Sequence, residues 1–190
     1  MPLFHRLWFP ILAVLAAMVP CYAEPPKPAE PDATLGAEVR KFAKNNLGKK
    51  VADGECASLV AKALEAAGAK TTDDFGVTGA DADYKWGTLV AKPEDARPGD
   101  IIQFRDVKTS VTKTEKVPGG GTRTSTRTQV MTHHTAIVSA NLGKGKFKVL
   151  EQNVGPADAD EKARKVVQEN DLDLGAKTEG KVWIYRPVSK

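Results

Sequence analysis

Apolar positions recur at helical spacing in two early segments of the chain. In residues 33–45 they are Leu35, Val39 and Phe42, and in "CASLVAKALEAAG", which begins at Cys56, they form one face that ends before Gly68. Recurrence every three or four residues predicts amphipathic helices, and a glycine after the last turn is a common helix end. We therefore expect two short helices separated by the turn "ADGEC".

The second half of the chain has the shorter apolar runs that are typical of strands. "IIQF" at 101–104 follows a Pro-Gly turn, "HHTAIVSA" and "FKVLEQNV" flank a glycine-rich turn, and "GKVWIYRPV" lies near the end. Residues 105–132 are rich in threonine on both sides of "PGGG", which predicts a β-hairpin. Helices followed by adjacent strands indicate an α+β domain, with N-terminal helices packed on an antiparallel sheet and an inserted hairpin.

The N-terminus has the layout of a secretory signal peptide. An arginine is followed by the apolar run from Leu7 to Val19 and by small residues up to Ala23. This pattern predicts cleavage after Ala23 and a secreted or periplasmic protein, because the run is short for a membrane span. A lipid-modified Cys21 and an uncleaved anchor are the alternatives. The proline-rich residues 24–32 then form a linker, and 33–190 form one domain.

Composition adds little to this picture. The formal net charge is +4, and the basic residues are spread along the chain rather than gathered in the dense stripe that nucleic acids require. We expect no nucleic-acid partner, no membrane contact after signal cleavage, and a monomer. The hairpin carries several cationic residues, among them Lys108, Lys113, Lys116, Arg123 and Arg127. They could bind an anionic polymer, or simply keep an exposed ribbon soluble.

Removal of 23 of the 190 residues would leave 167 residues and a single cysteine, Cys56. A lone thiol in an oxidising compartment is buried and inert, paired with another chain, or reactive. The predicted position at a helix start favours reactivity, because free backbone N–H groups and the helix dipole stabilise a thiolate. The same N–H groups could bind the oxyanion that forms when sulfur attacks a carbonyl.

A nucleophilic thiol needs a base and a group that orients the base. The histidines of the mature chain are His133 and His134, and strand alternation groups His134 with Ala136, a small residue suited to contact with the helix. In "VLEQNV", Glu151 and Asn153 would share a strand face and could orient the imidazole. Exposed polar residues at strand ends are the alternative for both segments. Two histidines and one cysteine are too few for a structural zinc site, so no metal or cofactor is expected.

The ordered segments "GEC", "PGDIIQF", "HTAIV" and "LEQN" resemble the papain-like cysteine amidases and peptidases of the CHAP and NlpC type. The resemblance implies that Cys56 is the nucleophile, His134 the base and Glu151 the orienting acid, with Asn153 a polar group near the oxyanion. A tryptophan such as Trp86 is more often a core residue than a substrate platform, but the resemblance implies that its segment runs near the cleft, where Trp86 could contact substrate. The long threonine-rich segment departs from the commonest bacterial pattern.

A narrower resemblance is to the cysteine-proteinase-fold domain of some fungal cortical actin-patch proteins. It is based on "ADGEC", Trp86-Gly87 and the C-terminal "YRP". The expected function is an exported cysteine amidase or peptidase that forms a thioester acyl-enzyme, with peptidoglycan peptide or another amide-containing polymer as substrate. The alternative is a catalytically silent module that keeps the fold and binds a glycan or protein through the basic hairpin.

Overall fold

The computed structural model describes residues 31–79, 81–117, 119–155 and 159–190. The expected signal peptide and most of the expected linker lie outside these residues. Within the described residues, no helix is long and apolar enough to cross a membrane. The helices are α1 (Pro31–Asn45), α2 (Cys56–Ala66) and α3 (Glu161–Arg164), and the strands are β1 (Thr88–Leu89), β2 (Ile101–Val117), β3 (Gly121–Gly143), β4 (Lys146–Glu151), β5 (Gln168–Asp173) and β6 (Lys177–Arg186).

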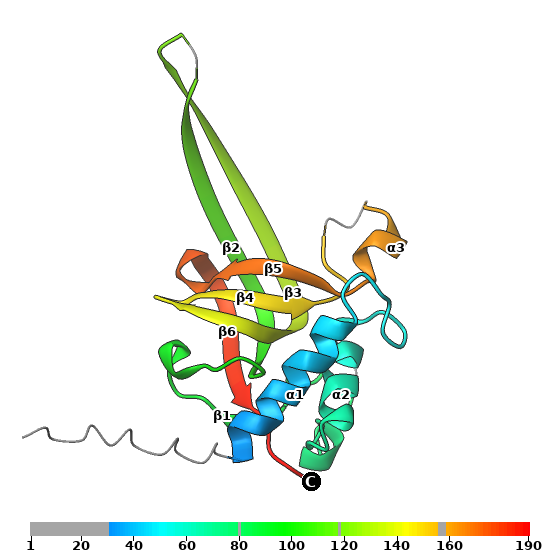
Figure 1. The fold of residues 1–190 in the computed structure, drawn as a ribbon. Coiled ribbons are helices and arrows are strands. Elements are labelled where there is room, and N and C mark those ends of the chain that lie inside the picture. The colour runs from blue at the N-terminus through cyan, green and yellow to red at the C-terminus, as the bar shows by residue number, and fades with distance from the viewer. Residues whose placement is uncertain (1–30, 80, 118, 156–158) are drawn as a thin grey trace, which may run out of the picture.

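The strands form one six-stranded sheet in the order β1-β6-β2-β3-β4-β5. All of its neighbouring strands run antiparallel. Figure 1 shows α1 and α2 side by side next to this sheet. The expected α+β architecture is therefore confirmed, although α1 begins at Pro31, two residues earlier than expected. The short strands β1 and β5 were missed.

The two faces of the sheet take part in separate hydrophobic clusters. On the helix side, the fully buried Leu59 and Leu64 of α2 pack with Ile101 and Ile137 of the sheet. On the other side, Phe104, Ala136 and further apolar side chains form a second cluster. This division contradicts the expectation that Ala136 faces the helix bearing Cys56. Strand alternation was read correctly, but the larger Ile137 lies on the face that the helices cover.

The threonine-rich hairpin is an extension of the two central strands. Residues of β2 and β3 are paired from Ile101↔Ile137 to Val117↔Gly121, so one long ribbon begins inside the sheet and continues past it. Figure 1 shows this ribbon projecting well beyond the other strands. The hairpin is thus confirmed, but it grows out of the strands that form the core.

A close backbone contact holds α1 against the turn that precedes β2. Gly99 has φ of 92°, and a Cβ built there would meet the carbonyl oxygen of Gly36 in α1 at 2.0 Å. A larger residue would push the helix away from the sheet. The "PGD" turn therefore fixes where the first helix lies.

Candidate active site

Cys56 is the first residue of α2, as the sequence predicted, and its thiol is free and partly exposed. Glu55 is the N-cap residue but makes no side-chain capping hydrogen bond. The backbone N–H groups of a first helical turn have no acceptor within the helix. Those of Cys56 and Ala57 are thus suited to bind a developing negative charge next to the sulfur.

His134 lies on β3 and is almost fully buried. Its Nε2 lies 2.7 Å from Oε2 of Glu151, the last residue of β4. The other Glu151 oxygen, Oε1, accepts a hydrogen bond of 3.0 Å from Nδ2 of Asn170 on β5. With Nε2 engaged by the carboxylate, the second ring nitrogen is left for the thiol of Cys56. The structure therefore brings together the three side chains expected to form the triad.

The thiol and the imidazole shift each other's pKa values toward an ion pair. Burial opposes charge on Cys56, but the hydrogen bond to His134, the positive charge of His134 and a backbone hydrogen bond from Thr135 together lower the pKa of the thiol. Burial likewise opposes charge on His134, yet hydrogen bonds to Cys56 and Glu151 and their negative charges raise its pKa to about 10. Both shifts favour the thiolate and imidazolium over the neutral pair.

His134 reaches the thiol even though strand alternation places it on the face opposite the helices. Its ring lies against Phe104 of the second cluster, with 5.8 Å between ring centroids. The neighbouring Thr135 is buried, and its backbone contacts the thiol. Thr135 therefore holds the start of α2 next to this point of β3, which places the adjacent His134 within reach.

Asn153 does not share a strand face with Glu151, because β4 ends at Glu151 and Asn153 has a left-handed φ of 59°. Its Nδ2 donates to Oε2 of Glu55 at 2.6 Å, and its Oδ1 accepts from Arg164 at 3.0 Å. The expected shared face is wrong, and the structure connects Asn153 to the residue before Cys56 rather than to His134. Its expected role near the oxyanion stays a prediction.

Gln152, which was not among the predicted site residues, fixes the turn before the nucleophile. This fully buried side chain donates to the carbonyl oxygens of Val51 and Glu55 at 3.0 and 2.7 Å. Its Oε1 accepts from the N–H of Val51 at 3.3 Å. The sequence did contain a signal for this role, because strand alternation places this glutamine on the covered face of the strand. Such a residue is buried only when its amide is satisfied.

Gly54 allows the same turn to approach Lys165. Its φ is 89°, and an added Cβ would lie 2.8 Å from the Cβ of Lys165. Lys165 in turn pairs with the carboxylate of Glu55 at 3.2 Å. The "GEC" segment therefore holds the start of α2 with a glycine conformation, an ion pair and the hydrogen bonds of Gln152.

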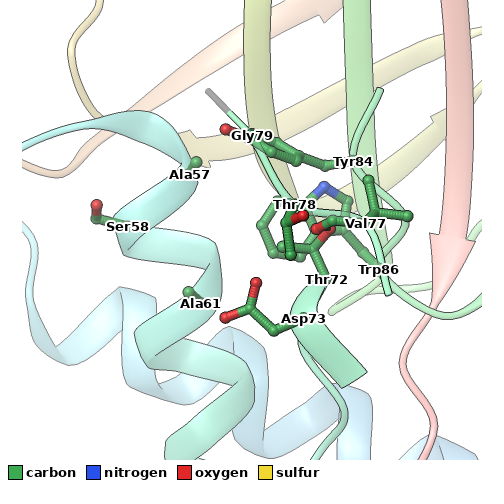
Figure 2. A pocket seen from close by; sticks show the side chains of 10 residues that line it. All are labelled: Ala57, Ser58, Ala61, Thr72, Asp73, Val77, Thr78, Gly79, Tyr84 and Trp86. Atoms are coloured by element: carbon green, nitrogen blue, oxygen red, sulfur yellow. Dashed lines mark hydrogen bonds between the residues drawn. The ribbon is translucent and has the colours of Figure 1, made fainter. Parts of the chain in front are cut away.

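Two cavities adjoin along the start of α2. One of about 390 Å³ contains Cys56, His134, Thr135 and Gln103 in its lining. The second, of about 340 Å³, is lined by the residues that Figure 2 labels, including Ala57, Ser58 and Tyr84, which it shares with the first. The thiol thus lies in a cleft that continues along the helix.

Trp86, the expected substrate-binding residue, belongs to the lining of the second cavity but is 1% exposed. Its Nε1 donates to Oε1 of Gln103 at 3.0 Å, and its ring packs edge-on against Tyr84. The indole forms part of the cleft base rather than an open platform. Direct contact with substrate stays a prediction.

A cysteine at the start of a helix, paired with a histidine and a carboxylate from an antiparallel sheet, defines a papain-like cysteine proteinase fold. Comparison with known families agrees: the family described as the AIM3/BBC1 cysteine proteinase-fold domain matches residues 24–190. The chain belongs to this family. No curated protein and no solved structure matches it.

Proposed function

We propose that the protein is a thiol-dependent hydrolase of the CHAP and NlpC type, which cleaves an amide bond through a thioester. The single observation that carries the proposal is the linked arrangement of Cys56, His134 and Glu151 in an open cleft. An inert core cysteine needs neither a charged partner nor an exposed surface. Here the thiol has both.

The reaction would begin with attack of the Cys56 thiolate on the amide carbonyl carbon. The new C–S bond pushes an electron pair onto the carbonyl oxygen, which the N–H groups at the start of α2 would stabilise. His134, held by Glu151, then donates its proton to the departing amine as the C–N bond breaks. This step leaves a thioester and a neutral imidazole.

The second half of the reaction would restore the thiolate. Neutral His134 takes a proton from water, the resulting hydroxide attacks the thioester carbonyl, and the C–S bond breaks. The products are a carboxylic acid and the original thiolate–imidazolium pair. Glu151 keeps the ring orientation and stabilises the positive charge throughout, without itself moving a proton.

An activated ester offers a direct test of acyl-enzyme formation. With p-nitrophenyl acetate at neutral pH, the protein should release one burst equivalent of nitrophenol and gain one acetyl group on Cys56, as read by intact mass. Cys56→Ala should show neither signal, and Lys62→Gln at an exposed position of the same helix serves as the control. Absence of both burst and acetyl adduct in the wild-type protein would exclude a competent nucleophile.

Cell-wall peptide is the substrate that we propose from the resemblance to the CHAP and NlpC enzymes, together with the export that the N-terminal sequence pattern predicts. Mass spectrometry of muropeptide mixtures, incubated with wild-type protein or Cys56→Ala, tests the substrate. A cleavage product that requires Cys56 supports it. A protein that forms the acetyl adduct but leaves every muropeptide intact would be a hydrolase of another amide.

A catalytically silent binding module is the second candidate, favoured by the ribbon of β2 and β3 that projects from the sheet with Lys116 and Arg123 exposed. These charges are partly offset, because Glu115 lies directly across from Arg123 in the strand register. A binding module would have no use for the pKa shifts of Cys56 and His134. The site geometry therefore supports the hydrolase better.

A further inference from the structure

The second cavity carries a feature that the catalytic residues do not use. One side of this cavity is lined by the small residues Ala57 and Ala61 of α2, and the other side by residues of the segment before β1, including Asp73. Figure 2 shows the carboxylate of Asp73 directed toward Ala61 across this space. A negative charge thus stands at the part of the cleft beyond the thiol.

Three carboxylates line the two cavities, and Asp73 differs from the others. Asp53 accepts a hydrogen bond from the Glu55 N–H, and Glu55 is bound by Asn153 and Lys165. Within the described part of the chain, the Asp73 carboxylate has no ion pair and no hydrogen bond. The nearby Lys85 lies over the ring of Phe75, 5.0 Å from its centroid.

The surroundings of Asp73 suit a cation on an apolar stem. Ala57, Ala61 and Val77 offer apolar contact, while the ring of Tyr84 adds an electron-rich surface of the kind that attracts cations. The cavity volume of about 340 Å³ is ample for one amino-acid side chain. A substrate anion would meet the unpaired carboxylate and be disfavoured.

We propose that this cavity is a specificity subsite that binds an ammonium group carried by the substrate on an aliphatic stem, with Asp73 as its counterion. The proposal rests on the hydrolase function, since the subsite selects which amide reaches Cys56. Two sources share this chemistry, a lysine-type side chain and the terminal amine of a peptide. Asp73 is a specificity-determining residue and takes no part in bond making.

The test uses irreversible labelling of Cys56 by tripeptide chloromethyl ketones, in which sulfur displaces chloride. The N-acetylated probes carry lysine, norleucine or glutamate at each of the three positions in turn, and a further norleucine probe has a free amine. At pH 7 the lysine side chain and the free α-amine are both mostly protonated, and the small thiolate fraction of an ordinary thiol still reacts. The ratio of rates between probes therefore reports the subsite, whether or not the thiol is activated.

The wild-type protein should react about 3- to 5-fold faster with the best cationic probe than with the acetylated norleucine probe, as expected for one partly solvated ion pair. Added salt should reduce this preference. Asp73→Asn should abolish it, with the rates of each protein divided by its own rate with the norleucine probe. The control Asp171→Asn removes an exposed carboxylate that pairs with Lys148 on β4, and it should keep the preference.

Equal rates for cationic and neutral probes in the wild-type protein would overturn the proposal, and so would a preference that survives in Asp73→Asn. Loss of preference only for the lysine probes, or only for the free-amine probe, identifies the source of the ammonium group. Chloroacetamide, which is too small to reach the subsite, reports the proposed hydrolase function separately through its rate at pH 6.5. Slow chloroacetamide labelling would count against the function alone.

Discussion

Replacing Glu151 with glutamine should disable the triad while keeping its shape. Glu151 presents both oxygens to donors, Nε2 of His134 at 2.7 Å and Nδ2 of Asn170 at 3.0 Å. A glutamine has one oxygen, so its NH2 group must face one of these two donors. The imidazole could avoid this clash by carrying its proton on Nδ1 and leaving Nε2 as an acceptor for the amide. In that form Nδ1, which faces Cys56, can no longer accept the proton of the thiol.

The structure sets the size of this effect. The side chains of His134 and Glu151 are 9% and 7% exposed, so the variant removes one charge of a buried pair and leaves donors facing each other. We expect a loss of about 2–4 kcal/mol in the free energy of unfolding. For a domain of this size, that corresponds to a decrease of roughly 5–15 °C in Tm.

The pH dependence of this loss has a definite sign. The pKa of His134 rises to about 10 in the folded protein, against about 6.5 in an unfolded chain. A raised pKa contributes stability that is fully present below the unfolded pKa and disappears as the pH rises through the folded pKa. The stability difference between wild type and Glu151→Gln should therefore be large at pH 6–7 and shrink toward pH 10.

Differential scanning calorimetry from pH 6 to pH 10.5, with chloroacetamide labelling of the same samples, measures both consequences. Glu179→Gln is the matched control, because Glu179 forms a 3.4 Å pair with Lys108 at the surface. That pair should contribute less than about 1 kcal/mol. Equal Tm and equal labelling for Glu151→Gln and wild type at pH 6–7 would refute the reasoning.

Three further predictions concern the supports of the site. Gln152→Leu leaves the 51–55 turn without three hydrogen bonds, so it should cost about 2–4 kcal/mol in denaturant unfolding and accelerate amide exchange in this turn. Gly54→Ala should lower the free energy of unfolding by about 1–3 kcal/mol and slow Cys56 labelling, because the alanine would have a positive φ and a close contact with Lys165. Gly48→Ala is the control: it has the same sign of φ but open space around the added Cβ, so its loss should be smaller. Replacing residues 111–127 by a two-residue turn should change the free energy of unfolding by less than about 1 kcal/mol and leave labelling intact, because a lone hairpin is marginally stable.

Each of these supporting predictions has a result that contradicts it. Unchanged exchange in the 51–55 turn of Gln152→Leu would show that other contacts hold the turn. Equal unfolding midpoints for the two glycine variants would show that the close contact between residue 54 and Lys165 does not affect stability. Slow labelling after ribbon replacement would show that the ribbon shapes the cleft.

The sequence predicted what depends on local pattern. The two helices, the glycine after α2 and the hairpin follow from apolar spacing and turn residues, which act over a few positions. The order of a helix-start cysteine and a strand histidine pointed to Cys56 and His134. The next strand left Glu151 and Asn153 both open as the orienting group, and only the family resemblance favoured Glu151. The polar residues were informative because each stands at a position where an apolar one would be expected.

The features that the sequence did not reveal depend on distant contacts. The prediction chose the wrong face of β3 as the one that the helices cover. Ala136 and Ile137 are both apolar, and strand alternation shows that they lie on opposite faces but not which face packs on the helices. The end of β4 at Glu151, and with it the departure of Asn153 from the strand, depends on contacts with Glu55 and Arg164. The role of Gln152 required knowing that the turn at 51–55 lies next to it.

The most direct test of the central claim is the pH profile of Cys56 labelling by chloroacetamide, compared between wild type and His134→Ala. An ordinary thiol of pKa about 8.5 is only about 1% ionised at pH 6.5. Since the pKa of Cys56 is lowered and that of His134 raised, wild type should react about 10- to 100-fold faster than the variant at pH 6.5. The rates should converge above pH 9, and superimposable profiles with an ordinary thiol pKa would contradict the account.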